Sequence, residues 1–229
     1  MKKKVQFRRM ALLLFMLMGA LTISAQSRSY IKEAIKKNGE CRNVAITKTN
    51  GDLMLYGRNG CARSGCPKGL NDAIVELNNA QEYIDDVQLT ENGRWLILYG
   101  NNGFLWNDIP YSLERQLREY NNEGETVLSV TFNDAGDWAI VSTEHVSASE
   151  TWIQDWLKEG MRNYGMLWTV CITDDAMVAV FEDGYKFYGN VPETLKTALN
   201  KTRIDVFRLK IAGTAWFFSD GKSRYDYYM

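Results

Sequence analysis

His145 is the only histidine of the chain and the side chain best suited to acid–base chemistry near neutral pH. As a general base it needs a nucleophile or an acid at a recognisable spacing, and the stretch around it, STEHVSASE, supplies none. No metal-ligand, phosphate-loop or nucleophile-elbow motif occurs in the sequence. The acidic pairs Asp85-Asp86 and Asp174-Asp175 are interpreted as strand-edge and turn residues. We therefore predict no catalytic residue, no metal site and no cofactor, and interpret His145 as a polar loop residue.

Two of the four cysteines, Cys61 and Cys66, are spaced closely enough to form a local disulfide bond. They flank the stretch ARSG, at places where a corresponding segment further along the chain has two apolar residues. The alternative is that both are small buried apolar side chains. Cys171 lies in the middle of a predicted strand and is interpreted as a packed free thiol.

Aromatic side chains are the remaining candidates for recognition, because rings with a polar edge are common at interfaces. The predicted ligand-binding set consists of Trp106, Tyr111, Tyr185, Tyr188 and Tyr227, together with His145. The alternative is that these rings pack in the core or between structural units.

The first 25 residues have the layout of a secretory signal peptide. Five basic residues and no acid precede an apolar run of 14 residues, Met10 to Ile23, and the small residues Ser24 and Ala25 follow it. The run is shorter than the roughly 20 apolar residues that span a bilayer. We predict cleavage after Ala25, a secreted or periplasmic location and no membrane insertion of the mature chain. The alternative is an uncleaved signal anchor.

The mature chain, residues 26–229, is acidic. Removing the five basic residues of the signal peptide leaves 22 Lys and Arg against 28 Asp and Glu, a net charge of −6. This charge and the lack of a basic tract argue against a nucleic-acid partner and against an anionic membrane surface. The composition, 45% apolar with only three prolines, predicts a single globular domain over 26–229.

Five segments of the chain repeat one pattern at a near-constant spacing. Their first strands align at Val44, Val87, Val130, Val170 and Leu209, which are 43, 43, 40 and 39 residues apart. A fixed period of this size is the signature of a repeat architecture. The predicted units cover approximately residues 29–65, 66–108, 109–146, 147–190 and 191–229.

Each unit has the same predicted anatomy. A short alternating strand is followed by a turn such as Asn92-Gly93, which favours a type I′ hairpin, and by a more apolar second strand such as WLILYG. A third strand leads to a helical pattern, in three units after a proline. Ser147 and Glu150 are spaced as a capping box for one of these helices. The predicted fold class is an α+β repeat protein, mainly β, with five βββα units of about 40 residues, phased αβββ along the chain.

A closed, propeller-like ring is predicted because the fifth hairpin, KIAGTAWFFSDG, is too apolar to be a terminal cap. The period, the glycine turns and a tryptophan in the second strand resemble β-propeller repeats. The tryptophans are Trp95, Trp138 and Trp216, with Leu53 and Met177 in the same slot elsewhere. We expect this slot to be buried.

The resemblance to β-propellers covers the whole mature chain, although the Trp-Asp and Gly-His signatures of WD repeats are absent and a helix replaces the fourth strand. The five α/β units are also similar to the five-fold α/β propeller of pentein-type proteins, which include amidino-group enzymes and a ribosome-binding initiation factor. The Cys, His and acid pattern of those enzymes is not identifiable, so no catalytic residue is carried over.

These observations lead to two hypotheses about function. The first is an exported, non-catalytic repeat scaffold that binds a protein or a glycan on a face of the ring. The alternative is a small exported enzyme of unknown reaction, with a site on the ring axis near His145. An axial pocket that combines acidic groups with His145 would favour the enzyme, and an exposed aromatic patch with His145 isolated would favour the scaffold.

Overall fold

A computed structural model describes residues 28–49 and 51–229 of the chain. The predicted signal peptide and its cleavage site lie outside the described residues. Within the described ranges, no helix has the length and apolar character needed to cross a membrane.

The described residues form five helices and fifteen strands in the predicted αβββ order. The first unit contains a helix over residues 28–38, β1 (Asn43–Ile46), β2 (Asp52–Tyr56) and β3 (Gly60–Ser64). The second contains α2 (Lys68–Asn79), β4 (Ile84–Leu89), β5 (Trp95–Tyr99) and β6 (Gly103–Asn107). The third contains α3 (Tyr111–Glu123), β7 (Val127–Phe132), β8 (Trp138–Ser142) and β9 (Val146–Ala148). The fourth contains α4 (Thr151–Tyr164), β10 (Leu167–Ile172), β11 (Ala176–Phe181) and β12 (Gly184–Gly189). The fifth contains α5 (Glu193–Lys201), β13 (Arg208–Ala212), β14 (Ala215–Ser219) and β15 (Tyr225–Tyr228).

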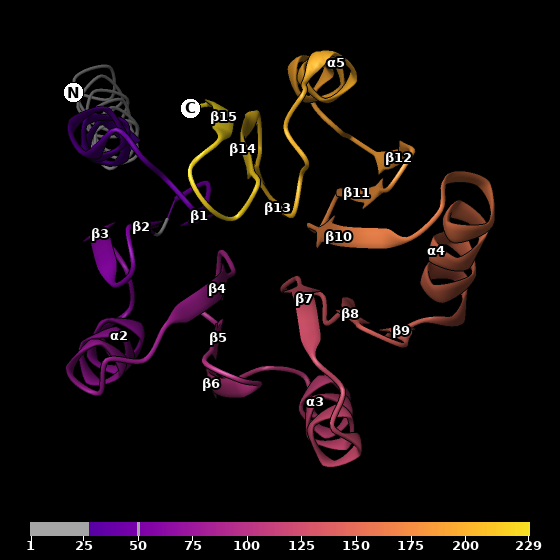
Figure 1. The fold of residues 1–229 in the computed structure, drawn as a ribbon, viewed down its shortest axis with the longest axis horizontal. Coiled ribbons are helices and arrows are strands. Elements are labelled where there is room, and N and C mark those ends of the chain that lie inside the picture. The colour runs from indigo at the N-terminus through magenta and orange to yellow at the C-terminus, as the bar shows by residue number, and fades with distance from the viewer. Residues whose placement is uncertain (1–27, 50) are drawn as a thin grey trace, which may run out of the picture.

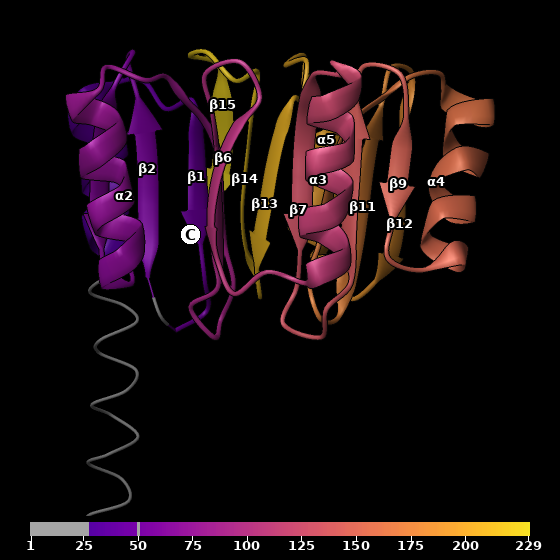
Figure 2. The ribbon, with the colours of Figure 1, turned by 90° about the horizontal axis from the view of Figure 1, so that it is seen from below.

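Each unit builds its own three-stranded antiparallel sheet, and the described strands form five separate sheets. The five sheets are arranged around a common axis, with the first strand of each unit innermost and the helices outermost (Figure 1). The helices run alongside the strands, and the turns between first and second strands all lie at one end of the molecule, the lower end in Figure 2. The predicted mainly-β repeat architecture is confirmed.

Every helix packs between two successive sheets, and this produces five apolar cores. The core around α2, for example, combines Leu55 of the first sheet, Leu70 and Ile74 of the helix, and Val87 and Ile97 of the second sheet. The apolar second strands and the apolar faces of the helices fit this arrangement, because both faces of each middle strand are covered. The sheets are therefore held together through side chains rather than through shared ladders.

The first and fifth units share one of these cores. Ile31 and Ile35 of the helix over 28–38 pack with Ala215 and Phe217 of β14. Strand β1 lies against β13 and β14. At the C-terminus, the Lys32 ammonium donates a hydrogen bond to the carbonyl oxygen of Met229 at 2.7 Å. The two ends of the described chain thus pack against each other, as Figure 1 also shows.

The tryptophan slot is buried, as predicted: Trp95, Trp138 and Trp216 are 7%, 4% and 4% exposed. Each ring lies against the first turn of the helix of its own unit. The indole of Trp138 donates to the Ser112 hydroxyl at 2.9 Å, and that of Trp216 donates to the Thr194 hydroxyl at 3.0 Å.

Trp95 lies against a glycine at the position that corresponds to Ser112 and Thr194. A Cβ atom added to Gly69 would be 3.6 Å from the Trp95 ring. In all three units, this partner is the second residue after the proline that precedes the helix.

Two local predictions are wrong. The capping box at Ser147 and Glu150 does not form, because Ser147 is part of β9 and its hydroxyl lies 2.6 Å from the Tyr120 hydroxyl, while Glu150 caps α4 without a side-chain hydrogen bond. The turn at Asn92-Gly93 is not type I′, because only Gly93 has a positive φ, of 80°. Glu91 is the first residue of this longer turn, which the Thr90 amide closes by donating to Arg94.

Candidate functional site

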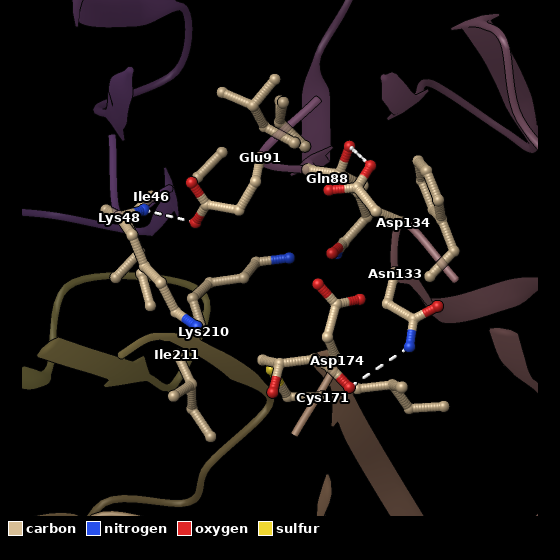
Figure 3. A pocket seen from close by; sticks show the side chains of 18 residues that line it. Ile46, Lys48, Gln88, Glu91, Asn133, Asp134, Cys171, Asp174, Lys210 and Ile211 are labelled. Carbon is tan, nitrogen blue, oxygen red and sulfur yellow. Dashed lines mark hydrogen bonds between the residues drawn. The ribbon is translucent and has the colours of Figure 1, made fainter. Parts of the chain in front are cut away.

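A pocket opens at the end of the axis where the turns between first and second strands lie (Figure 3). It encloses about 580 Å³ of space, including solvent at its mouth, and residues of all five units line it. The residues at the mouth occupy one repeated position of the unit, four residues after the aligned Val or Leu of each first strand. The five residues at this position are Lys48, Glu91, Asp134, Asp174 and Gly213.

Glu91 is held in place by the turn of the neighbouring first unit. Its carboxylate accepts hydrogen bonds from the backbone amides of Lys48 and Thr49 and from the Thr49 hydroxyl. Both carboxylate oxygens are engaged, since Oε1 accepts from Lys48 and Oε2 from Thr49. These bonds tie successive turns together at the mouth.

Asp134 links the second and third turns in the same way. Its Oδ1 accepts from the Thr90 hydroxyl at 2.6 Å, and its Oδ2 accepts from the backbone amide of Asn92 at 3.1 Å. Asp174 differs, because it is exposed and no hydrogen bond or ion pair to it exists within the described ranges. Its carboxylate points into the pocket in Figure 3.

A buried ion pair lies beneath the mouth. The Lys210 ammonium is 2.7 Å from Oδ1 of Asp86, and the two side chains are 9% and 2% exposed. Asn43 donates to the same oxygen at 2.6 Å, and Gln88 donates to Oδ2 at 2.9 Å. The pair joins the fifth unit to the second across the axis, because Lys210 is in β13 and Asp86 is in β4.

The pair is charged. Burial raises the pKa of Asp86, but the charges of Lys210 and Arg208 and the hydrogen bonds from Lys210 and Asn43 outweigh it and bring the pKa below its ordinary value. Asp86 is therefore ionised at neutral pH and offsets the charge of Lys210. Burying this pair is costly unless all its partners are present, and the hydrogen bonds from Asn43 and Gln88 supply them.

Gln88 contributes an acceptor to the pocket. The residue is 9% exposed, and its amide nitrogen is used by Asp86. Within the part of the chain that the structure describes, its amide oxygen has no hydrogen-bond partner, although Gln88 lines the pocket. The oxygen is not one of the fully buried unpaired atoms among the described residues, so it faces the pocket and is available to water or to a ligand group.

Cys171 lies at the base of the same pocket, in β10. Burial raises the pKa of its thiol to about 11, although Lys210 opposes the shift. The thiol is therefore protonated at neutral pH, and a protonated thiol is a poor nucleophile. The interpretation of Cys171 as a packed thiol agrees with this environment.

His145 is far from this pocket. It lies in the turn between β8 and β9, on the outer side of the third sheet, in a groove between α3 and α4. Its Nδ1 is 2.6 Å from Oε1 of Glu125, and its ring stacks on that of Tyr120. The prediction of an axial site near His145 is wrong, because the strands that its turn connects, β8 and β9, lie farther from the axis than β7 (Figure 1).

Glu125 is ionised beside His145. Burial raises the pKa of Glu125, but hydrogen bonds from Ser142 and His145 and the charge of His145 bring it below the ordinary value. The Glu125 carboxylate also accepts from the Ser142 hydroxyl. These bonds hold the turn between β8 and β9, where the sequence has no glycine although the corresponding turns of the other units do.

The structure does not bring the predicted aromatic set together. Trp106, Tyr185 and Tyr227 belong to the third strands of three different units, β6, β12 and β15, and each packs beside another aromatic residue of its own strand. All three are partly buried against apolar cores. Packing between units accounts for their positions, and a binding role for them stays a prediction.

Two aromatic candidates are exposed. Tyr111 begins α3 and is 77% exposed. Tyr188 in β12 is 53% exposed, and its ring is 5.3 Å from that of Trp152 in α4. Because they belong to different units and have different neighbours, they do not form one patch.

Cys61 and Cys66 are free thiols in the structure, on the side of the first sheet that packs against α2. Burial raises their pKa values to about 11 and about 12, and the proximity of Cys61 contributes to the shift of Cys66. The disulfide bond between them stays a prediction.

The axial groups Asp86, Lys210 and Asp174 were not predicted as site residues. Aligning the five units gives a signal that finds Asp86 and Lys210, since the residues on both sides of the aligned Val or Leu are polar in three of the five first strands, around Val87, Val130 and Leu209. Asp174 occupies the mouth position of its unit, as Glu91 and Asp134 do.

No protein-family model matches the chain, and no curated protein matches it. Among solved structures, the chain is similar to the extracellular domain of a protein described as a one component system from B. thetaiotaomicron, with 11% sequence identity and a TM-score of 0.33. The match covers 82% of this chain and 35% of the other.

Proposed function

We propose that the chain is an exported, non-catalytic binding module, and that its ligand, a protein or a glycan, inserts a small polar group into the axial pocket. One observation carries this proposal. Equivalent positions of the repeated turns, Glu91, Asp134 and Asp174 among them, converge on one pocket above a buried ion pair. Pockets with a few convergent polar groups are the usual places where proteins bind ligands.

The five units are proposed to close into a ring. The shared core of the first and fifth units and the hydrogen bond between Lys32 and Met229 support closure. The ion pair between Lys210 and Asp86, which belong to the fifth and second units, supports it as well. Closure places the pocket on the ring axis, where every unit contributes to it.

Binding is favoured over catalysis by the chemistry of the pocket. Its thiol, that of Cys171, is protonated at neutral pH. The only histidine of the chain, His145, lies in another groove. The carboxylates Glu91 and Asp134 are occupied by hydrogen bonds from neighbouring turns, which suits recognition of a fixed group.

The proposed location is secreted or periplasmic, on the pattern of the first 25 residues. The mature net charge of −6 supports a ligand other than nucleic acid and argues against docking on an anionic membrane.

The test is a screen of the mature chain, residues 26–229, on a printed glycan array and a peptide array. Asp174→Trp places a large ring over the pocket from an exposed position, and Asp155→Trp places the same ring on the exposed face of α4. We expect binding to be lost with Asp174→Trp and retained with Asp155→Trp. Binding that survives Asp174→Trp would show that the axial pocket is not the site.

A further inference from the structure

The geometry of the axial pocket points to a ligand group of one chemical class. We infer that the group it binds is a primary ammonium, carried by a lysine side chain, an amino sugar or a free amine. This inference rests on the proposed function, because it concerns the same pocket.

Charge is the first argument. Three carboxylates, of Glu91, Asp134 and Asp174, lie at the mouth against one lysine, Lys48. The second lysine of the pocket, Lys210, is offset by its ion pair with Asp86. The pocket therefore carries a net negative charge, and its enclosed position increases the attraction for a cation relative to open solvent.

The free hydrogen-bonding capacity gives the second argument. The amide oxygen of Gln88 is an acceptor without a partner among the described residues, in a side chain that is more than nine-tenths buried. Asp174 offers a carboxylate that accepts no hydrogen bond within the described ranges. Both groups can only accept, so they require a donor on the ligand, and a charged donor satisfies the carboxylate best.

The arrangement of these acceptors selects the ammonium. A guanidinium binds best when both oxygens of one carboxylate are free to accept a parallel pair of hydrogen bonds. Glu91 and Asp134 already use both oxygens in bonds from Lys48, Thr49, Thr90 and Asn92. Among the carboxylates at the mouth, only Asp174 could accept such a pair, and a pair made there would not involve the Gln88 oxygen.

An ammonium instead directs three donors toward separate oxygens. Gln88, Asp134 and Asp174 belong to three different units and supply such oxygens. Lone pairs that remain on the oxygens of Asp134 are enough for one further hydrogen bond. The ammonium would therefore lie between Gln88 and the mouth, above Lys210.

The experiment is a titration of the ¹⁵N-labelled mature chain, followed by NMR, with three pairs of probes. Each pair contains an amine and its neutral acetylated counterpart: Nα-acetyl-lysine methylamide and its Nε-acetyl form, glucosamine and N-acetylglucosamine, and cadaverine and its diacetyl form. We expect the amines to shift the signals of pocket residues such as Gln88 and Asp174, and their neutral counterparts to leave them unchanged. The pair that binds most tightly identifies the carrier of the ammonium.

Two substitutions of Asp174, with one control substitution on α4, test whether the amine binds at the mouth of the pocket. Asp174→Asn should weaken amine binding about tenfold, because it removes one charge-assisted hydrogen bond. Asp174→Lys should abolish it, and Asp155→Asn on α4 should leave it unchanged. Equal binding of amines and neutral counterparts, no amine binding, or an unchanged affinity of Asp174→Asn would overturn the inference. The proposed function would still stand if an array ligand were lost with Asp174→Trp.

Discussion

Among single residues, Asp86 and Lys210 form a buried ion pair that connects the second and fifth units across the axis. Each is buried, each is charged, and each belongs to a different unit of the molecule. Removing one member of such a pair leaves the other as an uncompensated buried charge, which costs far more than removing both.

We therefore expect Asp86→Asn to lower the free energy of unfolding by ~3–5 kcal/mol. The double variant Asp86→Asn/Lys210→Met should recover most of that loss, because no buried charge remains. Urea unfolding followed by tryptophan fluorescence measures both variants. If the double variant were no more stable than the single one, the cost would come from the lost hydrogen bonds of Asn43 and Gln88 rather than from Lys210.

Glu125 gives a prediction with a definite pH window. Its pKa in the folded chain is below the ordinary value, so its ionised form stabilises the fold above about pH 4.3, the usual value for a glutamate. That stabilisation is lost as the pH falls through the folded pKa. Glu125→Gln should therefore melt below the parent at pH 6, and the difference should shrink as the pH falls through the folded pKa.

Thermal melts across this range test the prediction, with Glu144→Gln as the control. Glu144 is exposed in the same turn, so its substitution should leave the melting temperature nearly unchanged at every pH. A constant difference between Glu125→Gln and the parent from pH 6 to pH 3 would mean that the carboxylate charge does not stabilise the turn.

Among the helices and strands, the contact between a second strand and the first turn of its helix recurs in three of the five units. The strand contributes a tryptophan ring in three units, and the helix contributes a small residue in contact with it. The pairs are Trp95 with Gly69, Trp138 with Ser112, and Trp216 with Thr194. In the fourth unit the strand position carries Met177, and the corresponding helix position carries Trp152, whose ring lies beside that of Tyr188.

We expect Trp95→Ala and Trp216→Ala each to cost ~3–5 kcal/mol of unfolding free energy, as deletions of a buried tryptophan do. Gly69→Ala should be tolerated, because its added Cβ would make ordinary contacts 3.6 Å from the Trp95 ring. Gly160→Ala should destabilise the fold, because the Cβ would lie 2.1 Å from the Phe181 ring. Melting temperatures of the four variants test this, and parent-like melting of both alanine variants of tryptophan would contradict the packing of the slot.

The elements were predictable and the site was not, for a physical reason. Strand, turn and helix follow from periods of two and 3.6 residues, which are local, so the spacing of Val44, Val87 and Val130 located the units. The prediction of a type I′ turn at Asn92-Gly93 is wrong because the type of a turn depends on where the ladder ends. Asp86 and Asp174 were interpreted as strand-edge and turn residues, which describes their local position, but their meeting at the axis depends on how five sheets pack.

At the scale of the whole molecule, closure of the ring is the property to test. A ring needs every unit, whereas an open row of units tolerates the loss of the last one. We expect deletion of 206–229 to abolish cooperative folding, because it removes Ala215 and Phe217 from the core of the helix over 28–38 and removes Lys210 from Asp86. Urea unfolding measures this, and a cooperative transition of the shortened chain at a lower urea concentration would indicate an open row.

Export is tested on the same scale by mass spectrometry of protein recovered from outside the cytoplasm. We expect the mature chain to begin at Gln26. A non-reduced peptide map of this material should show Cys61 bonded to Cys66. The full 229-residue chain in the cytoplasm would contradict export, and alkylation of both thiols would contradict the bond.

The core that joins the helix over 28–38 to β14 also sets the order of events during biosynthesis. If the chain crosses a membrane from its N-terminus, this helix emerges first and its partners in β14 emerge last. The apolar side chains of Ile31 and Ile35 then stay uncovered until translocation is complete. Contacts between segments so distant in sequence also form slowly, and unfinished chains expose apolar surface in the meantime. The molecule would therefore depend on a holding chaperone in its new compartment, and release from that chaperone would coincide with arrival of the final strands.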